Sequence, residues 1–456
     1  MHQFTGMGRI AQLRRLGLFD TRVPRYTSYP SSPHFSPDVG AGEQDSWLRA
    51  IPEGGEISLY VHVPFCRRLC WFCACRTQGV RSDDPVEAYL GTLLKELALV
   101  AERLPDGVRL SRLHWGGGTP TLLRPAMIET LAQAIRDVAP FADDAEFSVE
   151  IDPNEVDGDR IRALSEAGMN RASIGVQDFD PVIQKTIGRE QTYETTRQVV
   201  EMLRAAGIES LNADILYGLP HQTPSGIAET VQMLLTLTPD RVALYGYAHV
   251  PWMARRQTMI PEEHLPEAEA RLDLFETARN LFLWDGYAEI GIDHFARPGD
   301  GLENAARTGR LRRNFQGYTD DTAPVLVGIG ASAISRFPQG YVQNASGTAD
   351  YQRRVRGGEL AGVRGHAFTD DDRFRARMIE ALMCDFEIDR AEIEAMGADR
   401  ALLSRLFTEA AAAFPGMVEV DERRFRILPE GRPLTRMVAR SFDAYDSSRA
   451  RHSAAF

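Results

Sequence analysis

The chain has 456 residues, of which 43% are hydrophobic and 25% are charged, and these proportions are typical of a soluble globular protein. Its 52 lysines and arginines against 64 aspartates and glutamates give a formal net charge of −12, which argues against nucleic-acid binding. No apolar run reaches the length of a membrane-spanning helix and no secretory signal is visible, so we expect a cytoplasmic protein without membrane contact.

From residue 56 to about residue 250, apolar strand-like segments alternate with amphipathic helical patterns. We predict strands over residues 57–64, 110–115, 147–152, 171–177, 210–216 and 242–248. Helices are expected between them, over residues 84–104, 125–138, 159–167, 193–206 and 225–237. The first of these helices has Asp84, Pro85 and Glu87 at its start, which predicts a capping box. Six βα units in a row predict an α/β fold, a partial (β/α)6 TIM-like barrel that binds ligands at the C-terminal ends of its strands.

The segments on either side of this region differ in pattern. Residues 1–50 have weak periodicity and are predicted to be an N-terminal arm over the main domain. Residues 51–364 are assigned to the barrel and its extension, which includes a long helix over 266–284. Residues 365–456 are predicted to form a small helical, winged-helix-like domain, with helices over 371–384, 390–396, 401–413 and 433–444 and a β pair at 417–420 and 424–427.

Four of the five cysteines lie close together after the first predicted strand, and they are Cys66, Cys70, Cys73 and Cys75. Disulfides between such near neighbours would close small strained loops. A zinc site usually takes ligand pairs from separated segments. We therefore favour an iron–sulfur cluster over zinc, because three thiolates would leave one iron open for a ligand.

Other candidate residues also follow or lie within the predicted strands. Gly116, Gly117 and Gly118 would let a ligand approach the backbone closely, with a plain tight loop as the alternative. Glu150 and Asp214 lie within apolar strands and would hold hydroxyl or amino groups of a ligand, unless each pairs with an arginine or lysine. A turn is expected at Asp152, and Cys384 is expected to be a buried thiol.

Several motifs between residues 24 and 335 resemble those of one family. They are PRYTSYP at 24–30, YVHVPFC at 60–66, HWGGGTPT at 114–121, GVQDF at 175–179 and RNFQGYT at 313–319. With these motifs the chain resembles the radical S-adenosylmethionine (SAM) enzymes, and within that superfamily the oxygen-independent coproporphyrinogen III oxidases.

The resemblance implies a set of site residues. Cys66, Cys70 and Cys73 would bind a 4Fe-4S cluster, with Cys75 close by but not a ligand. A first S-adenosylmethionine would contact Tyr60, Gly117 and Glu150. A second would contact Phe72, Gly118, Thr119, Gln177, Arg189, Asp214, Ala248 and Ile334. Cys75 is a candidate catalytic residue, and His62 and His294 are candidates for proton handling, with a structural role as the alternative.

The resemblance also implies an activity, the oxidative decarboxylation of two propionate side chains of coproporphyrinogen III to vinyl groups, which gives protoporphyrinogen IX. The hydrogen that is lost has no adjacent carbonyl, so a general base cannot remove it at a useful rate, whereas a 5′-deoxyadenosyl radical can. We expect a monomer that takes electrons from a reducing partner such as flavodoxin or ferredoxin. A haem-binding chaperone, another porphyrin-acting radical SAM enzyme and a zinc-stabilised structural protein are the alternatives.

The implied substrate has four carboxylates, whereas the chain is acidic. We therefore expect a local basic patch that faces the cluster, built from some of Arg25, Arg189, Arg297 and Arg313. The N-terminal arm is expected to close over the substrate. For each arginine, an ordinary salt bridge is the alternative.

Overall fold

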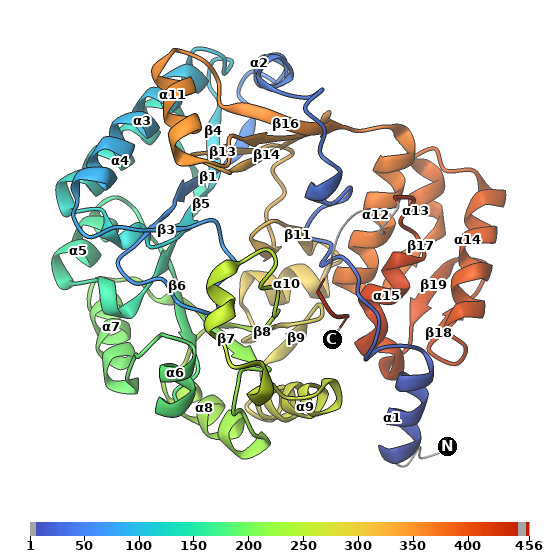
Figure 1. Ribbon diagram of the computed structural model, residues 1–456. Coiled ribbons are helices and arrows are strands. Elements are labelled where there is room, and N and C mark those ends of the chain that lie inside the picture. Colours follow the sequence, from blue (N-terminus) through green and yellow to red (C-terminus); the bar gives the residue numbers. More distant parts are fainter. Residues whose placement is uncertain (1–5, 446–452, 456) are drawn as a thin grey trace.

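The computed structural model describes residues 6–445 and 453–455. Its largest sheet has twelve strands in the order β16-β15-β14-β13-β1-β4-β5-β6-β7-β8-β10-β9. Seven adjacent strands run parallel and form the inner wall of the arc in Figure 1. They are β13 (Leu326–Ile329), β1 (Glu56–Val63), β4 (Arg109–Gly117), β5 (Phe141–Ile151), β6 (Arg171–Gln177), β7 (Ser210–Tyr217) and β8 (Arg241–Gly246).

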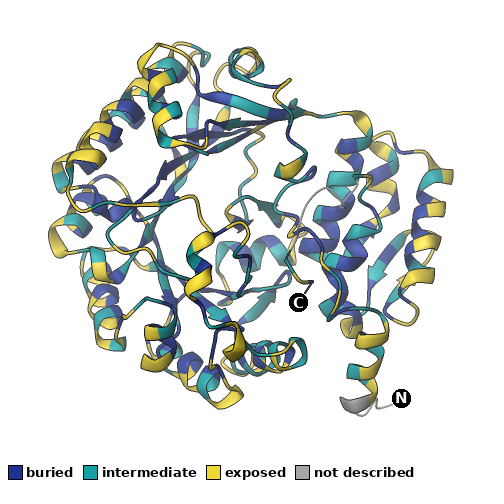
Figure 2. Ribbon diagram, in the orientation of Figure 1, coloured by how far each residue is buried: buried dark blue, intermediate teal, exposed yellow. Residues whose placement is uncertain are grey.

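Helices cover the outer face of this parallel sheet (Figure 1). They are α3 (Asp84–Ala101), α4 (Pro125–Val138), α5 (Gly158–Glu166), α6 (Pro181–Thr186), α7 (Tyr193–Ala205), α8 (Pro224–Thr236) and α9 (Ala268–Trp284). The main hydrophobic core lies between the strands and these helices, with Trp115 and Phe147 among its largest fully buried side chains. Figure 2 shows the strands buried and the outward faces of the helices exposed.

The predicted partial barrel is confirmed, with three corrections. A seventh parallel strand, β13, pairs with β1 on the side away from β4. β5 begins at Phe141, well before the predicted start at residue 147. The predicted capping box is wrong, because Asp83 is the N-cap residue of α3 and makes no side-chain cap bond. The Asp83 carboxylate instead pairs with Arg67 and lies 3.8 Å from Arg124.

Shorter strands extend the sheet at both edges and pair elsewhere. β10 (His294–Ala296) and β9 (Ala288–Ile290) add antiparallel strands beside β8. β14 (Ile334–Phe337), β15 (Gly340–Asn344) and β16 (Gly362–Ala367) do so beside β13. Two small pairs, β2 (Phe65–Cys66) with β3 (Gln78–Gly79) and β11 (Arg312–Asn314) with β12 (Gly317–Thr319), lie outside the large sheet. The extension also contains α10 (Gly301–Arg307) and α11 (Thr348–Arg356).

The C-terminal part of the chain has its own hydrophobic core, which includes Phe407 and Phe425. Its helices are α12 (Asp370–Asp385), α13 (Arg390–Ala395), α14 (Arg400–Ala413) and α15 (Thr435–Arg440). β17 (Glu387–Asp389), β19 (Arg424–Ile427) and β18 (Val418–Val420) form a three-stranded sheet, one strand more than predicted. The division of the chain at residues 50 and 364 remains a prediction.

The N-terminal arm does more than cover the barrel. It contains α1 (Gly6–Arg15) and α2 (Ala41–Arg49), and α1 lies beside the C-terminal helices in Figure 1. Leu13, Leu18 and Tyr29 are buried in the C-terminal core. Arg9 pairs with Glu276 of α9 at 2.7 Å. The arm therefore connects the C-terminal core to the barrel. Within residues 6–445 and 453–455, no helix combines the length and apolar character needed to cross a membrane.

Candidate active site

The four clustered cysteines lie on a loop that leaves the C-terminal end of β1. Cys66 belongs to β2, which pairs with β3 beyond the loop, so both ends of the loop are fixed. Cys66, Cys70 and Cys73 are half-buried free thiols, and Cys75 is an exposed one. Cys384 is a buried thiol on α12, as expected, far from this loop in sequence.

The cysteine loop is tied by hydrogen bonds to the end of α6 and to the segment after β8. The Trp71 N–H donates to the carbonyl of Ile187 at 2.9 Å. The Gln257 Nε2 donates to the carbonyls of Phe72 at 2.6 Å and Ala248 at 3.0 Å, so this buried amide connects the loop to the segment after β8. Such contacts hold the thiols in place before any ligand binds.

The charges around the thiols differ from one cysteine to the next. Burial raises the pKa of Cys66 to about 11 and also raises the pKa of Cys70. A hydrogen bond from Cys75 is the main cause that lowers the pKa of Cys73 to about 6. Arg189 donates to the Cys70 sulfur at 3.6 Å and lies 3.2 Å from Asp152. Thiols buried beside a cation are suited to bind, as thiolates, to a positively charged iron centre.

The thiol geometry does not fit a single metal ion. Among the described residues, no group of three or more Cys, His, Asp or Glu side chains is arranged to hold one ion. Cys66, Cys70 and Cys73 are three half-buried thiols on one loop, and three thiolates on a four-iron cluster would leave one iron open for a ligand.

The glycine turn after β4 brings bare backbone up to the cysteine loop. Gly117 has φ +115°, and a Cβ atom there would meet the His62 ring at 2.6 Å. A Cβ on Gly118 would meet the carbonyl oxygen of Phe65 at 2.5 Å. The Gly118 N–H donates to Val63, and the Thr119 N–H donates to Phe65. Only glycine allows this close approach next to Cys66.

Glu150 faces the interior of the barrel from β5. It accepts from the Gly117 N–H at 2.9 Å, and its other oxygen lies 3.3 Å from the His114 Nε2. Burial would raise the pKa of Glu150, but the hydrogen bond from His114 helps to lower it overall. Its side chain is 42% exposed, and within residues 6–445 and 453–455 it pairs with no arginine or lysine, contrary to the salt-bridge alternative. The carboxylate therefore stays open to a further partner.

Asp214 on β7 also lacks an arginine or lysine partner within the described chain. Asn212 donates to it at 2.8 Å and the Ser173 hydroxyl at 3.4 Å. Burial raises the pKa of Asp214 to about 6. Asp152 accepts from the Asn154 N–H at 3.0 Å, which confirms the predicted turn.

His62 is fully engaged by protein groups. Its Nε2 lies 3.2 Å from the carbonyl of Arg76, so this nitrogen must donate, and its Nδ1 then accepts from the Tyr60 hydroxyl at 2.9 Å. Burial lowers the pKa of His62. This arrangement favours the structural alternative for His62, and it places Tyr60 against the rings of His62 and His114.

The remaining predicted cofactor residues lie at or just beyond strand ends, on the cysteine loop, or after α6. Gln177 ends β6 with φ +69°, an unusual conformation for a residue other than glycine. Ile334 begins β14 after the turn that follows β13. Phe72 and Ala248 line a large cavity, described next, whereas Arg189 does not.

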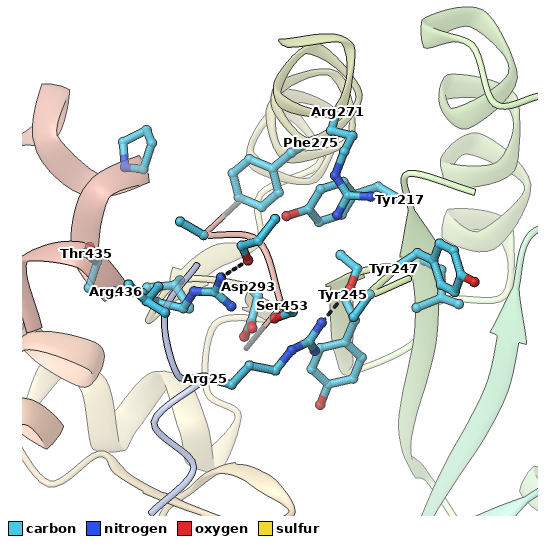
Figure 3. Close-up of a pocket in the computed structure, with 18 of the residues that line it drawn as sticks. Arg25, Tyr217, Tyr245, Tyr247, Arg271, Phe275, Asp293, Thr435, Arg436 and Ser453 are labelled. Atoms are coloured by element: carbon cyan, nitrogen blue, oxygen red, sulfur yellow. Dashed lines mark hydrogen bonds between the residues drawn. The ribbon is translucent and has the colours of Figure 1, made fainter. Parts of the chain in front are cut away.

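A cavity of about 1600 Å³ opens in front of the cysteine loop. Phe72, Cys73 and Cys75 line one part of it, and the N-terminal arm, α9 and the C-terminal helices line the rest. Figure 3 shows arginine and tyrosine side chains that reach into this space from different segments. Since a drug-sized pocket measures roughly 300–1,000 Å³, the cavity has room for a larger ligand.

The structure separates the predicted substrate arginines. Arg25 and Arg313 line the cavity. Arg313 is stacked over the Tyr318 ring at 4.5 Å and lies 4.0 Å from Asp293, which in turn contacts His294 at 2.7 Å. Arg297 is not part of the cavity wall, because it stacks on Tyr287 and its N–H donates to Asp240 at the start of β8, the end opposite the site.

Sequence reasoning missed four residues of this site. His114 contacts Glu150, and Gln257 holds the cysteine loop. Arg271 of α9 and Arg436 of α15 line the cavity. His114 begins the HWGGG motif and was within reach of a motif-based argument, whereas nothing local marks the other three.

Comparisons with known proteins agree with this geometry. Residues 60–234 match the Radical SAM superfamily. The oxygen-independent coproporphyrinogen III oxidase of Paracoccus denitrificans (strain Pd 1222) is 65% identical over 450 residues, which are 98% of this chain and 100% of the relative. The chain belongs to the oxygen-independent coproporphyrinogen III oxidases. The family member of Escherichia coli (strain K12) is 39% identical, with 94% of each chain covered. A solved structure of coproporphyrinogen III oxidase from Escherichia coli, described as a radical SAM enzyme, is similar at 37% identity and a TM-score of 0.88 over 93% of this chain and 100% of the other.

Proposed function

We propose that this chain is a radical SAM enzyme that oxidatively decarboxylates two propionates of coproporphyrinogen III to vinyl groups without oxygen, and so forms protoporphyrinogen IX. The observation that carries the proposal is that the cysteine loop and a set of arginines line one cavity of about 1600 Å³. A macrocycle with carboxylates needs both an apolar space and local positive charge.

Cys66, Cys70 and Cys73 would hold a 4Fe-4S cluster, and the half-buried loop with Arg189 beside Cys70 suits that role. When bound, the cluster and S-adenosylmethionine supply a carbon-centred radical that can take the unactivated hydrogen from a propionate side chain. Cys75 is not assigned as a ligand, since it is the exposed thiol of the four.

Two S-adenosylmethionine molecules would bind along the C-terminal ends of the strands. Tyr60, Gly117 and Glu150 would contact the first, through bare backbone and an open carboxylate. The second would use the residues that share the neighbouring strand ends, namely Phe72, Gly118, Thr119, Gln177, Arg189, Asp214, Ala248 and Ile334. With a pKa of about 6, Asp214 would be mostly ionised at pH 7 and would accept hydrogen bonds from hydroxyl or amino groups.

The rest of the proposal concerns the setting of the reaction. The enzyme would work as a monomer in the cytoplasm and take electrons from a reducing protein such as flavodoxin or ferredoxin. Aromatic side chains on the cavity wall, among them Tyr245, Tyr247 and Phe275, would exclude water from the radical step.

Anaerobic incubation with coproporphyrinogen III, S-adenosylmethionine and a reductant tests the function directly. We expect loss of two carboxyl groups by mass, with vinyl product. Serine variants of Cys66, Cys70 and Cys73 should each lose iron and the visible absorbance after reconstitution, whereas Cys384→Ser should keep both. A methylated or cleaved porphyrin, or a bound and unchanged one, would instead support the other porphyrin-acting enzyme or the chaperone.

A further inference from the structure

The wall of the large cavity carries an excess of positive charge. It includes eight arginines and four carboxylates, namely Glu276, Glu289, Asp293 and Glu430. Some of these arginines are neutralised by protein groups. Arg9 pairs with Glu276 at 2.7 Å, and Glu289 pairs with Arg279 at 2.7 Å and with Arg432 at 2.9 Å. These pairs need no other partner.

Three other arginines of the same wall contact only carbonyl oxygens among their hydrogen-bond partners in the described chain. Arg25 donates to Gly246 at 3.0 Å, Arg271 donates to Gly218 at 3.5 Å and Arg436 donates to Ala454. A guanidinium has five N–H donors, so one neutral carbonyl leaves most of its capacity unused. The Nε of Arg271 is buried and has no hydrogen-bond partner.

Arg25 repels the guanidinium groups of Arg271 and Arg436. Burial lowers the pKa of Arg271, and Arg25 lowers it further. Burial, with Arg25 as the next cause, lowers the pKa of Arg436 to about 9. Asp293 offsets part of this repulsion at Arg436, and an anionic ligand would offset more of it.

The three arginines come from segments far apart in the sequence. Figure 3 shows Arg25 on the N-terminal arm, Arg271 on α9 and Arg436 on α15 around one space. Arg271 lies 5.6 Å over the Tyr217 ring, which fixes the direction of its guanidinium. Because the three arginines lie on different segments around one space, they suit a ligand with several carboxylates at its rim better than a ligand with one.

We propose that Arg271 and Arg436, together with Arg25, bind propionate carboxylates of the substrate. This inference rests on the proposed function, since the carboxylates are those of coproporphyrinogen III. Each guanidinium would exchange a carbonyl for a carboxylate, which accepts two N–H bonds and carries the opposite charge. The Ala454 carbonyl that now accepts from Arg436 would be replaced by a carboxylate oxygen.

Binding of coproporphyrin III to the reconstituted enzyme tests this assignment without turnover. The probe keeps four carboxylates, and its absorbance and fluorescence report binding. Arg271→Gln and Arg436→Gln should each weaken binding by about tenfold or more. Arg271→Lys and Arg436→Lys keep the positive charge but lose the paired N–H donors of the guanidinium. Their affinities should lie between those of the wild type and of the glutamine variants. Arg279→Gln is the matched control, because Arg279 lies on α9 and lines the same cavity but is paired with Glu289.

Two further measurements separate binding from folding and from the function itself. Iron content of each variant should match the wild type and its melting temperature should be no lower, and protoporphyrin IX, with only two carboxylates, should lose less affinity in the variants than coproporphyrin III does. If the wild type binds coproporphyrin III and the glutamine variants bind it equally well, the assignment is wrong while the proposed function stands. If the wild type neither binds the probe nor converts the porphyrinogen, the proposed function itself fails.

Discussion

Gln257 is the side chain whose removal should most directly loosen the cysteine loop. It is fully buried and makes three hydrogen bonds, two as donor to Phe72 and Ala248 and one as acceptor from the Val250 N–H at 2.5 Å. Gln257→Leu keeps a similar volume but leaves two carbonyls and one N–H without their partner. With a net value of roughly 0.5–1.5 kcal/mol per bond, we expect a loss of about 2–4 kcal/mol.

This loss of free energy should destabilise the cysteine loop rather than the barrel. Phe72 lies between Cys70 and Cys73, so a released loop spreads the thiols that would bind the cluster. Anaerobic reconstitution followed by iron and sulfide analysis should show reduced cluster content, together with a lower melting temperature. Gln78→Leu, at an exposed position of β3, is the control and should change neither. Full iron content and an unchanged melting temperature in Gln257→Leu would refute this account of the loop.

Three further predictions concern other parts of the site and the core. Glu96 is buried and accepts hydrogen bonds from Gly330, Asn344 and Tyr351. Burial raises its pKa to about 7 in the folded protein. Its contribution to the free energy of unfolding is therefore present below about pH 4.5 and lost as the pH rises through 7. Denaturant unfolding should show this slope in the wild type, and Glu96→Gln should flatten it; an equal slope in both would contradict the assignment. Gly118→Ala should reduce cluster content, because its Cβ would meet the Phe65 carbonyl, whereas Gly91→Ala, in open space on α3, should raise the free energy of unfolding by about 0.5–1 kcal/mol. Asp214→Asn should lower turnover by tenfold or so with iron content unchanged, if the lost charge-assisted bond is worth about 1.5 kcal/mol; normal kinetics in this variant would show that Asp214 holds no cofactor group.

The strands of the barrel were predictable because one face of each is buried and most of the other is at least partly buried. Such strands read as apolar runs that end at glycine, proline or polar residues, and the six predicted ones all exist. The first half of β5 was not predictable, because Asp143 and Asp144 interrupt the apolar pattern and are exposed in the strand. β13 was missed as a parallel strand because it is short and its pairing with β1 is remote in sequence.

The residues of the site also divide into those that the sequence could predict and those that it could not. The cysteine loop and the glycine turn are local motifs, so their residues could be named in advance. Arg271 and Arg436 could not, because an arginine on an amphipathic helix usually faces solvent, and only the packing of the C-terminal helices across from α9 turns both toward one cavity. Arg297 shows the reverse error, since it was expected in the basic patch that faces the cluster and lies beside the start of β8, away from the site.

The whole chain is acidic but the wall of the cavity is basic, and this difference in charge explains how an acidic protein can bind a polyanion. The net charge of −12 belongs to the whole surface, and salt screens it beyond a Debye length of about 8 Å at physiological ionic strength. The cavity wall has eight arginines against four carboxylates, so the field inside it has the opposite sign. Among those arginines, Arg25, Arg271 and Arg436 donate only to carbonyl oxygens within the described chain. A ligand with several carboxylates would thus be repelled weakly at a distance and held strongly inside the cavity. A neutral porphyrin ester of the same size would lose the attraction to the cavity arginines.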